Sequence, residues 1–393
     1  MRRKRIIFLL SHPIQYFSPL FQFMAKDELI DLLVLYCSDE NIKGHYDKGF
    51  GTDVKWDIPL LEGYNNRFLK NNSLKPSLFN GFWGLLNFEI FNVLRKEKGS
   101  FLVIHGWNYA TNFLAIIAAK LFGLKLCLRG ENPLNQELLK SKSILLLRKI
   151  FFKYIFFPLF NYFFYIGNQN KQLYKYYGVD ENKLIFTPYA VDNERFKSEY
   201  EKNFEKKTEI RSELSLPIDK IIVLTSGKYI IKKRPMDLLK AFKLLNNNEI
   251  ALVFLGEGEL RKEMEEYIIN NKLNNVFLTG FKNQSEVGKY FAAADIFVLP
   301  SGVGETWGLV LNEAMNFALP VIVSDVPGSA YDLVIDNENG YKFICGNIED
   351  LTLKIKLLIS KKEIIRVFGN MSKDLIKNYS FDIIINNIKL GLK

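Results

Sequence analysis

The sequence predicts an α/β protein with two domains, each built on a doubly wound parallel sheet. Short apolar runs of strand length alternate with longer amphipathic stretches, a pattern typical of strand–helix–strand units. This alternation occurs twice, and a polar break over residues 192–215 separates the two halves. At 393 residues the chain exceeds one ordinary core, since a prior of roughly 150 residues per domain suggests two.

The strands are predicted where short apolar runs are bounded by polar or turn residues. In the first half they span residues 5–10, 32–37, 101–105, 125–129, 162–166 and 184–187. In the second half they span 221–226, 251–256, 276–279, 296–300, 320–324 and 340–344. Helices are expected between them, for example over 234–245, 259–271 and 313–317. We expect domains over 1–190 and 191–375, and a C-terminal helix over 376–393 that packs back on the first domain.

The composition is that of a folded protein in a reducing compartment. Hydrophobic residues make up 48% of the chain and charged residues 24%, which argues against global disorder. Cys37, Cys127 and Cys345 are far apart and form no CxxC pair. A reduced, cytoplasmic protein is therefore expected.

The net charge of +10 is concentrated in the first half of the chain. Residues 1–170 hold 22 basic and 13 acidic side chains, a surplus of nine, whereas 171–393 hold 31 and 30, a surplus of one. Such a basic half favours an anionic membrane or a phosphorylated substrate as partner. No nucleic-acid-binding motif accompanies it, so nucleic acid is not expected.

Two segments resemble targeting or membrane elements. MRRKR is followed by IIFLL, which is too short for the apolar core of a signal peptide. Residues 143–167 are interrupted by charges and by Pro158, so no transmembrane helix is expected. On a helical wheel Lys142, Lys149 and Lys153 fall within about 40°. Such a helix either lies on an anionic membrane or is mostly buried with one solvated stripe, and the basic surplus favours the membrane.

The segment PSGVGETWGLVLNEAMNFALPVIVSDVPGSAYDLV, residues 300–334, carries the sharpest signal. A strand ends, a glycine-bearing loop follows, and a helix begins near Leu309. Backbone N–H groups of Trp307, Gly308 and Leu309 would favour a phosphate at the helix start. Glu305 and Glu313 could accept hydrogen bonds from a sugar diol. The alternative is a solvated helix start with two unremarkable glutamates.

Further polar groups follow other strands. In TSGKYIIKKRP, Lys228 and Lys233 could neutralise a pyrophosphate, or form a solvated basic loop. His105 ends a strand and is followed by Asn108, and LRGENPL places Arg129 and Glu131 at the next strand end. Arg129 and Glu131 could bind a ligand, or pair with each other. The turn SHPIQY after the first strand offers His12, Gln15 and Tyr16, either as turn residues or as a loop facing the acceptor or sugar.

These motifs together resemble the retaining glycosyltransferases of family 4, which have the GT-B fold of two Rossmann-like domains facing a central cleft. The resemblance rests on PS, E-x-x-G-L, N-E-A-M, L-P-V-I-V-S-D and V-x-G within residues 300–334, and on the Glu-x7-Glu spacing. LVFLGEGELRKEMEEY resembles the family's strand, G-x-G turn and helix, and VFLTGF its base-side strand and loop. Residues 165–196 resemble the crossing between domains, where Asp192 is expected to cap a turn.

The resemblance implies roles for individual residues. Glu305 would hold the hydroxyls of the transferred sugar, Glu313 the ribose, and Lys233 the diphosphate. Lys228 stands where the family usually has arginine, and His105 matches a histidine near the donor sugar. The resemblance implies catalytic residues Glu305, His105 and Lys233, and two sets of binding residues. The donor set is Lys228, Lys233, Glu305, Thr306, Trp307, Gly308, Leu309, Glu313, Gly256 and Phe281. The acceptor-side set is His12, Gln15, Tyr16, Asn108, Arg129 and Glu131.

The function implied is retaining, metal-independent transfer of a sugar from a nucleotide-diphosphate sugar to a hydroxyl acceptor. No Asp-x-Asp motif occurs, and no cofactor or metal is expected. A lipid-linked or growing saccharide in bacterial capsule or O-antigen synthesis is the implied acceptor, reached from the cytoplasmic face of the membrane. The alternatives are a nucleotide-sugar 2-epimerase of the same fold and a catalytically silent scaffold protein.

Overall fold

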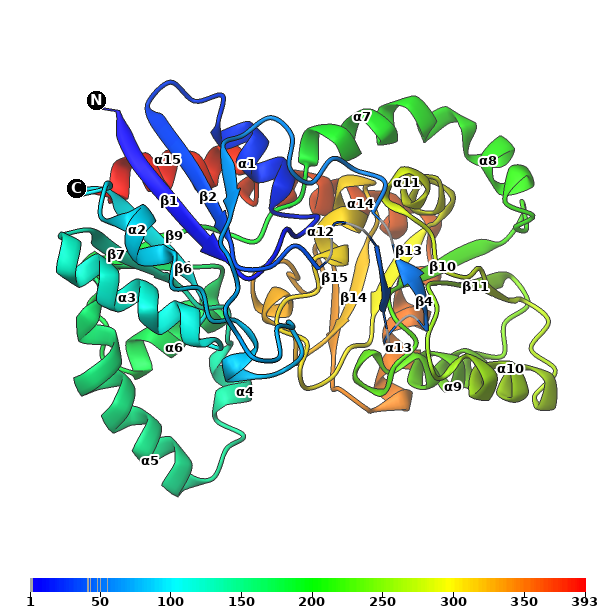
Figure 1. Ribbon diagram of the computed structural model, residues 1–393. Helices are drawn as coiled ribbons and strands as arrows, with labels where there is room; N and C mark the ends of the chain where they lie inside the picture. The colour runs from blue at the N-terminus through cyan, green and yellow to red at the C-terminus, as the bar shows by residue number, and fades with distance from the viewer. Residues whose placement is uncertain (1–2, 41, 43, 48, 50, 55) are drawn as a thin grey trace. The chain divides into compact units, whose positions relative to one another are not determined.

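The computed structural model describes residues 3–40, 42, 44–47, 49, 51–54 and 56–393, and the chain forms two compact units. Unit 1 consists of Met1–His45, Ile58–Tyr189 and Phe381–Lys393, and unit 2 of Tyr46–Asp57 and Ala190–Ser380. Helices lie on both faces of the main sheet in each unit (Figure 1). In the described part of the chain, no helix is long and apolar enough to cross a membrane.

Unit 1 is built on a parallel sheet whose strand order, within the described residues, is β5-β2-β1-β6-β7-β8-β9. These strands are β1 (Lys4–Leu10), β2 (Ile30–Tyr36), β5 (Asn66–Phe68), β6 (Phe101–His105), β7 (Lys125–Arg129), β8 (Tyr162–Tyr165) and β9 (Leu184–Phe186). Its helices are α1 (Ser18–Met24), α2 (Ile90–Leu94), α3 (Ala110–Phe122), α4 (Leu134–Glu137), α5 (Lys142–Ile150), α6 (Asn168–Tyr176) and α15 (Phe381–Gly391). The order reverses between β1 and β6, as in a doubly wound sheet.

Unit 2 repeats this plan with the strand order β12-β11-β10-β13-β14-β15 among its described residues. The strands are β10 (Ile221–Ser226), β11 (Ile250–Leu255), β12 (Val276–Leu278), β13 (Ile296–Leu299), β14 (Val321–Ser324) and β15 (Gly340–Phe343). The helices are α7 (Asn193–Asn203), α8 (Lys207–Glu213), α9 (Pro235–Leu245), α10 (Arg261–Asn270), α11 (Gln284–Ala293), α12 (Val310–Asn316), α13 (Ile348–Ile359) and α14 (Lys362–Leu375). A short ribbon of β3 (His45–Asp47) and β4 (Thr52–Val54) forms a separate two-stranded sheet.

The central strands are buried on both faces, which explains why they read as continuous apolar runs. Every residue of β11, β13 and β14 is buried, as expected for parallel strands covered by helices. The predicted strands over 101–105, 125–129 and 221–226 begin and end where the structure has them, and the others agree within two residues. The α/β, doubly wound prediction is confirmed.

The polar break predicted over 192–215 begins just after the chain passes from unit 1 to unit 2 at Tyr189–Ala190, and most of it is helical. Asp192 caps α7 by accepting a hydrogen bond from the Arg195 amide at 3.0 Å. Phe196 and Ile210 are buried on the inner faces of α7 and α8. The polar residues that suggested a break form the solvated faces of two amphipathic helices.

The predicted domain limits also differ from the units in two places. Tyr46–Asp57 belongs to unit 2 although the sequence interpretation assigned it to the first domain. Its described contacts to unit 2 residues, treated below, hold it there. The segment over 376–380 belongs to unit 2, and the helix that packs in unit 1 is α15, which contacts α1 and β9.

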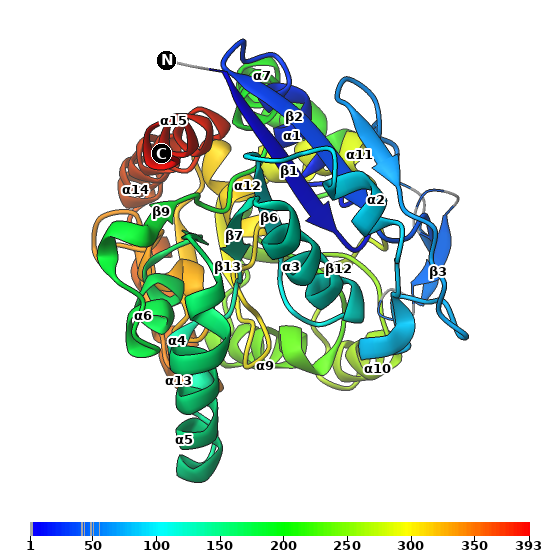
Figure 2. The same ribbon diagram turned by 60° about the vertical axis from the view of Figure 1, so that its left-hand side comes forward.

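Residues 142–167 form several elements rather than one long helix. After α5 the chain continues as a π-helix over Phe151–Phe156, a 3₁₀ turn over Phe157–Leu159, and β8. The interpretation of a mostly buried helix is wrong for α5, none of whose residues is buried. This helix projects from unit 1 (Figures 1 and 2).

Arg211 organises the start of unit 2, so its removal should destabilise the protein. Its guanidinium donates to the carbonyls of Ala293 (2.9 Å), Ile218 (3.0 Å) and Lys220 (2.9 Å), and to the Asp295 carboxylate (2.6 Å). Because Arg211 is buried, Arg211→Ala should lower the free energy of unfolding by about 3 kcal/mol. Denaturant unfolding measures this, with Arg366→Ala, an exposed position, as the control. Equal stability of the two variants would contradict this account.

Candidate functional site

The strand order of unit 2 reverses between β10 and β13, and this is where the predicted donor residues gather. The loops that follow these two strands line a common pocket, with Gly227, Lys228, Lys233, Pro300 and Ser301 among its residues. In open α/β sheets, ligands bind beyond the carboxyl ends of the strands at such a reversal. Fold and sequence therefore point to the same position.

Lys233 and Glu305 form an ion pair across this pocket's two loops. Glu305 is 8% exposed, and Lys233 ends a 3₁₀ turn over Ile231–Lys233. The backbone joins the loops as well, since the Gly302 amide donates to the Lys232 carbonyl at 2.8 Å. The structure thus brings together two residues that are 72 positions apart and that the sequence singled out independently.

Lys228 is paired with a residue that the sequence did not indicate. Its ammonium lies 2.7 and 2.8 Å from the two carboxylate oxygens of Asp47. Asp57 extends the contacts of the same segment, since its carboxylate accepts a hydrogen bond from the Ser285 amide at 3.1 Å. Trp56 meets Phe281 with ring centroids 6.3 Å apart. The short, polar segment over 46–57 carries no periodic signal that could have placed it here.

Residues 306–309, the predicted phosphate cradle, also make contacts that stabilise the fold. Gly308 has φ +85°, and a Cβ there would lie 2.6 Å from Leu299, so packing against β13 requires glycine. The Trp307 ring is buried, and its indole N–H donates to Asn312 at 2.9 Å. Leu309 is the N-cap of α12, and the Thr306 carbonyl accepts a hydrogen bond from the Gly328 amide at 3.0 Å. The packing of Gly308 against Leu299 is therefore by itself a reason for glycine at this position.

Glu313 lies in the first turn of α12, among residues of α7 and α11. Burial raises the pKa of this carboxyl to about 7, although Arg195 and a hydrogen bond from Gln284 act in the opposite direction and Glu199 adds to the increase. A carboxyl group with this pKa is a proton donor and acceptor near neutral pH. The sequence located Glu313 but not Arg195, Glu199 or Gln284, because they come from other helices.

The G-x-G turn after β11 supports the Lys228 loop. Gly256 has φ +152°, and a Cβ there would lie 2.0 Å from the Gly227 carbonyl oxygen. At Gly258 a Cβ would lie 2.7 Å from the Tyr229 backbone. These glycines let two loops approach closely, so the expected donor-side position of Gly256 has a packing reason of its own. Phe281 follows β12 and the isolated bridge between Gly256 and Gly280.

In unit 1, His105, Arg129 and Glu131 form one charged cluster at the ends of β6 and β7. His105 Nε2 lies 2.8 Å from a Glu131 carboxylate oxygen, and Arg129 Nε lies 3.4 Å from the same atom. Burial opposes ionisation, yet His105 and Arg129 together lower the pKa of Glu131 to about 2. Arg129 also donates to the carbonyl (3.0 Å) and hydroxyl (2.9 Å) of Thr187. The pairing of Arg129 with Glu131 that the sequence left open is present.

The turn after β1 lies at the reversal of the first sheet, beside this cluster. His12 Nδ1 is 2.9 Å from the Ser11 hydroxyl. Tyr16 meets Tyr189 at a ring-centroid distance of 6.0 Å, and burial raises its pKa. Phe17, one residue on, packs edge-on against His105 at 4.9 Å. Gln15 is partly exposed in the turn, and Asn108 is exposed before α3.

The predicted residues therefore divide between the two units. Unit 2 holds Lys228, Lys233, Glu305 and Glu313, and unit 1 holds His12, Tyr16, His105, Arg129 and Glu131. Sequence reasoning missed Asp47, Thr187 and Tyr189 as members of these groups. Thr187 ends the predicted strand over 184–187 and Tyr189 comes two residues later, and this position at a strand end was the available signal.

The raised pKa of Glu313 predicts a specific pH dependence of stability. The native state holds this proton more tightly than the unfolded chain, whose glutamate has a pKa of about 4.5. The associated stabilisation is fully present below pH 4.5 and is lost as the pH rises through 7. When the pH is raised from 5 to 8, the free energy of unfolding should fall by about 2 kcal/mol more in the wild type than in Glu313→Gln, which has no carboxyl group to ionise. Denaturant unfolding across this range tests this, with exposed Glu363→Gln as control, and parallel profiles would contradict it.

Comparison with known proteins shows which family and which proteins this chain is similar to. Residues 206–379 match the family model of glycosyl transferases group 1. A UDP-Gal:alpha-D-GlcNAc-diphosphoundecaprenol alpha-1,3-galactosyltransferase from Escherichia coli is 26% identical over 319 residues, which cover 76% of this chain and 79% of that protein. An uncharacterized glycosyltransferase, MJ1178, from Methanocaldococcus jannaschii is 31% identical over 156 residues, which cover 40% of this chain. The match spans 43% of MJ1178 and 38% of the sulfoquinovosyl transferase SQD2 of Arabidopsis thaliana.

Solved structures share the fold over the whole chain. A glycosyltransferase from Rickettsia africae ESF-5 has a TM-score of 0.74 at 16% identity, covering 100% of this chain and 98% of that one. Anabaena Alr3699/HepE, solved in complex with UDP and glucose, has a TM-score of 0.71 at 16% identity, covering 99% of each chain. The two doubly wound sheets are those of the GT-B fold. Residues 206–379, which lie in unit 2, carry the match to the glycosyl transferases group 1.

Proposed function

We propose that this protein is a retaining glycosyltransferase that moves a sugar from a nucleotide-diphosphate sugar to a hydroxyl acceptor without a metal ion. The observation that carries the proposal is the pairing of Lys233 with Glu305 at the reversal of the second sheet. A cation and a carboxylate held together there match the two needs of such a donor. The ammonium neutralises the departing diphosphate, and the carboxylate accepts hydrogen bonds from the sugar.

The remaining donor residues take the roles that follow from their positions. Lys228 contributes a second positive charge beside the pocket, and Glu313 accepts hydrogen bonds from the ribose. With both lysines at the diphosphate, the positive charge that a metal ion often supplies comes from side chains. Attack occurs on the face from which the diphosphate leaves, and a donor phosphate oxygen takes the proton of the acceptor hydroxyl. The configuration at the anomeric carbon is thereby retained.

Unit 1 supplies the acceptor side of the reaction in this proposal. Glu131 is ionised over the physiological range, because His105 and Arg129 keep its pKa at about 2 against the effect of burial. It holds the imidazole of His105 through the 2.8 Å contact at Nε2. His105 is thereby oriented toward a sugar hydroxyl, and His12, Gln15 and Tyr16 line the neighbouring turn.

We further propose that the acceptor is a saccharide on a lipid carrier, in the assembly of a bacterial surface polysaccharide such as capsule or O-antigen. The relative from E. coli, aligned over 76% of this chain, is named for an acceptor linked to diphosphoundecaprenol. A TuaC protein of Bacillus subtilis, 33% identical over 131 residues, is named for teichuronic acid biosynthesis. The basic surplus of residues 1–170 suits the anionic cytoplasmic face of a membrane, where such an acceptor would be met.

Substitution of the paired residues tests the proposed chemistry. Glu305→Gln and Lys233→Ala should each lower the rate of sugar transfer by on the order of a hundredfold, because each removes an interaction made in the transition state. Circular dichroism should show that both variants are folded. The exposed neighbours Lys232→Ala and Glu259→Gln are matched controls and should keep the wild-type rate. The wild-type rate should also be unchanged by EDTA.

Two results would contradict the proposal. Near-normal transfer by both site variants would remove the assigned roles of Lys233 and Glu305. An epimerised nucleotide sugar formed without any acceptor would instead indicate a nucleotide-sugar 2-epimerase. The donor is identified beforehand by the rise in melting temperature that UDP- and GDP-sugars cause.

The Asp47–Lys228 pair predicts that donor binding is weakened by an internal competitor. Asp47→Asn removes the carboxylate that holds the Lys228 ammonium, so the diphosphate no longer has to displace it. The dissociation constant of UDP or GDP should fall up to about fivefold, the range of a partly exposed ion pair. Titration calorimetry measures it. Asp57→Asn, in the same segment but bound to Ser285, is the control, and an unchanged constant in Asp47→Asn would refute the competition.

A further inference from the structure

Helix α5 presents an apolar surface to solvent. None of its residues is buried, and Leu146 and Leu147 are 61% and 68% exposed. The exposed apolar surface continues into the following π-helix. We name the whole set the α5 surface: Ile144, Leu146, Leu147, Ile150, Phe151, Tyr154 and Ile155, which are all exposed. Apolar patches of this kind on a folded domain mark an interaction site.

Specific contacts hold this helix in place, and they fix the orientation in which its apolar face is exposed. Arg148 forms an ion pair with the buried Glu137 carboxylate. Lys140 (2.8 Å) and the Tyr177 hydroxyl (2.5 Å) also donate to Glu137. Phe152 and Phe156 on the inner side are buried against Trp107. The inner face is thus anchored by one ion-pair cluster and a set of aromatic contacts.

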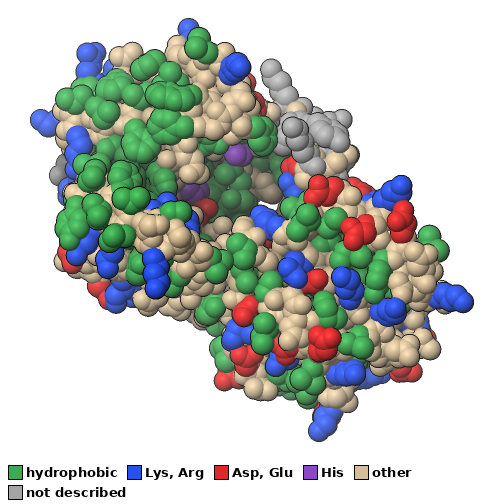
Figure 3. All heavy atoms as spheres, turned by 90° about the horizontal axis from the view of Figure 1, so that it is seen from below, with side chains coloured by type: hydrophobic (Ala, Val, Ile, Leu, Met, Phe, Trp, Pro, Cys, Tyr) green, Lys and Arg blue, Asp and Glu red, His purple; other side chains and the backbone are tan. Residues whose placement is uncertain are grey.

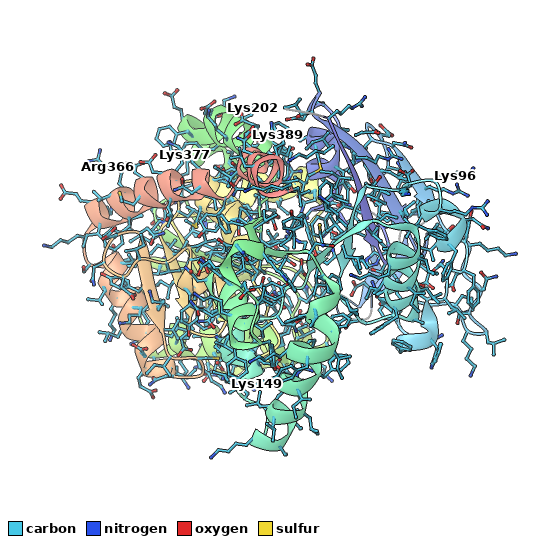
Figure 4. The ribbon with its side chains drawn as sticks, turned by 90° about the vertical axis from the view of Figure 1, so that its left-hand side faces the viewer. Lys96, Lys149, Lys202, Arg366, Lys377 and Lys389 are labelled. Atoms are coloured by element: carbon cyan, nitrogen blue, oxygen red, sulfur yellow. The ribbon has the colours of Figure 1, made fainter. Side chains whose placement is uncertain are left out.

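The charge around the α5 surface is positive. No acidic residue occurs between Glu137 and Asp180. Lys142, Lys149 and Lys153 are exposed, and in the described part of the chain none of the three forms an ion pair. Lys149 lies on this projecting helix (Figure 4). Lys142 and Lys149 lie on one side of α5 at about 100° per residue, along the edge of the apolar arc, and Lys153 follows in the π-helix.

We infer that the α5 surface is inserted into the headgroup region of an anionic lipid bilayer, with Lys142, Lys149 and Lys153 on the lipid phosphates. This inference rests on the proposed function. It names the surface by which the protein would reach a lipid-linked acceptor. An apolar arc edged by lysines is the pattern of helices that lie in the plane of a membrane. The absence of acidic residues from 138–179 removes the repulsion that anionic lipids would otherwise cause.

A second group of exposed aromatic residues extends the same side of unit 1. Trp83 is 66% exposed and contacts Phe82. Phe82 meets Phe113 at 5.5 Å, Phe113 meets Phe156 at 5.9 Å, and Phe156 stacks on Phe151 at 5.6 Å. Seen from below, hydrophobic side chains gather over this part of unit 1 (Figure 3). Tryptophan at this position suits the interface between headgroups and water.

Vesicle co-flotation of the full chain tests the inference. The vesicles contain phosphatidylcholine with or without the anionic lipid phosphatidylglycerol, and no saccharide lipid. The wild type should float with the anionic vesicles. Leu146→Ser/Leu147→Ser should bind them at least tenfold more weakly, through lost apolar burial. Lys142→Gln/Lys149→Gln/Lys153→Gln should lose on the order of a hundredfold at low ionic strength.

Matched controls separate the surface from general hydrophobicity and charge. Leu244→Ser/Ile269→Ser removes two exposed apolar residues from unit 2, and Lys243→Gln/Lys361→Gln/Lys362→Gln removes three exposed lysines there. Both should float like the wild type, and thermal unfolding should show that all variants are folded.

Any of three outcomes overturns the inference. These are a wild type that does not float, α5 variants that float like the wild type, or a dimer in light scattering that Leu146→Ser/Leu147→Ser dissociates without any vesicle binding. The last would make the α5 surface an interface between copies of the chain. Because flotation needs no donor or acceptor, it can fail while sugar transfer succeeds, and the reverse also holds.

Discussion

The parallel pairing of β10 with β11 on one side and β13 on the other is the constraint on which the site in unit 2 depends. Because all three strands run in the same direction, their carboxyl ends open at one edge of the sheet. After β10 the chain continues to β11 on one side of the sheet, and after β13 it continues to β14 on the other side. The loops carrying Lys233 and Glu305 therefore begin side by side and meet in an ion pair. Unit 1 repeats the arrangement, where β1 and β6 place the SHPIQY turn next to His105.

Electrostatic compensation maintains the charged groups at both reversals. A buried charge without a partner costs several kcal/mol, so these carboxylates need cations or protons. Glu131 has His105 and Arg129 and stays ionised, with its pKa lowered to about 2. Glu313 lies among groups that compensate it less well, and burial raises its pKa to about 7. Two glutamates of one protein thus differ in charge at neutral pH because of their surroundings alone.

Two stretches of the chain show how far a local sequence pattern predicts structure. The stretch over 192–215 was predicted as a polar break between the two halves, and buried Phe196 and Ile210 show that it forms two amphipathic helices. The stretch from 142 to 167 suggested one basic, apolar helix, and the structure divides it. Its apolar residues belong to two populations: Phe152 and Phe156 point into the core, whereas Leu146 and Leu147 point to solvent. Apolar residues alone do not reveal which face finds a partner.

By itself, the sequence determined the positions of twelve strands and the two doubly wound sheets, but not β3, β4 and β5. The strand positions follow from local period and turn residues, which act over a few neighbouring positions. It was the resemblance to a known family that grouped Lys228, Lys233, Glu305 and Glu313 as donor-side residues. Tertiary structure alone decided that Asp47 pairs with Lys228, that Arg129 reaches Thr187, and that Gln284 and Arg195 surround Glu313. The physical reason is that these contacts join residues 58 to 181 positions apart or lie on separate helices. Their partners are selected by how sheets and helices pack, and no local pattern records that choice.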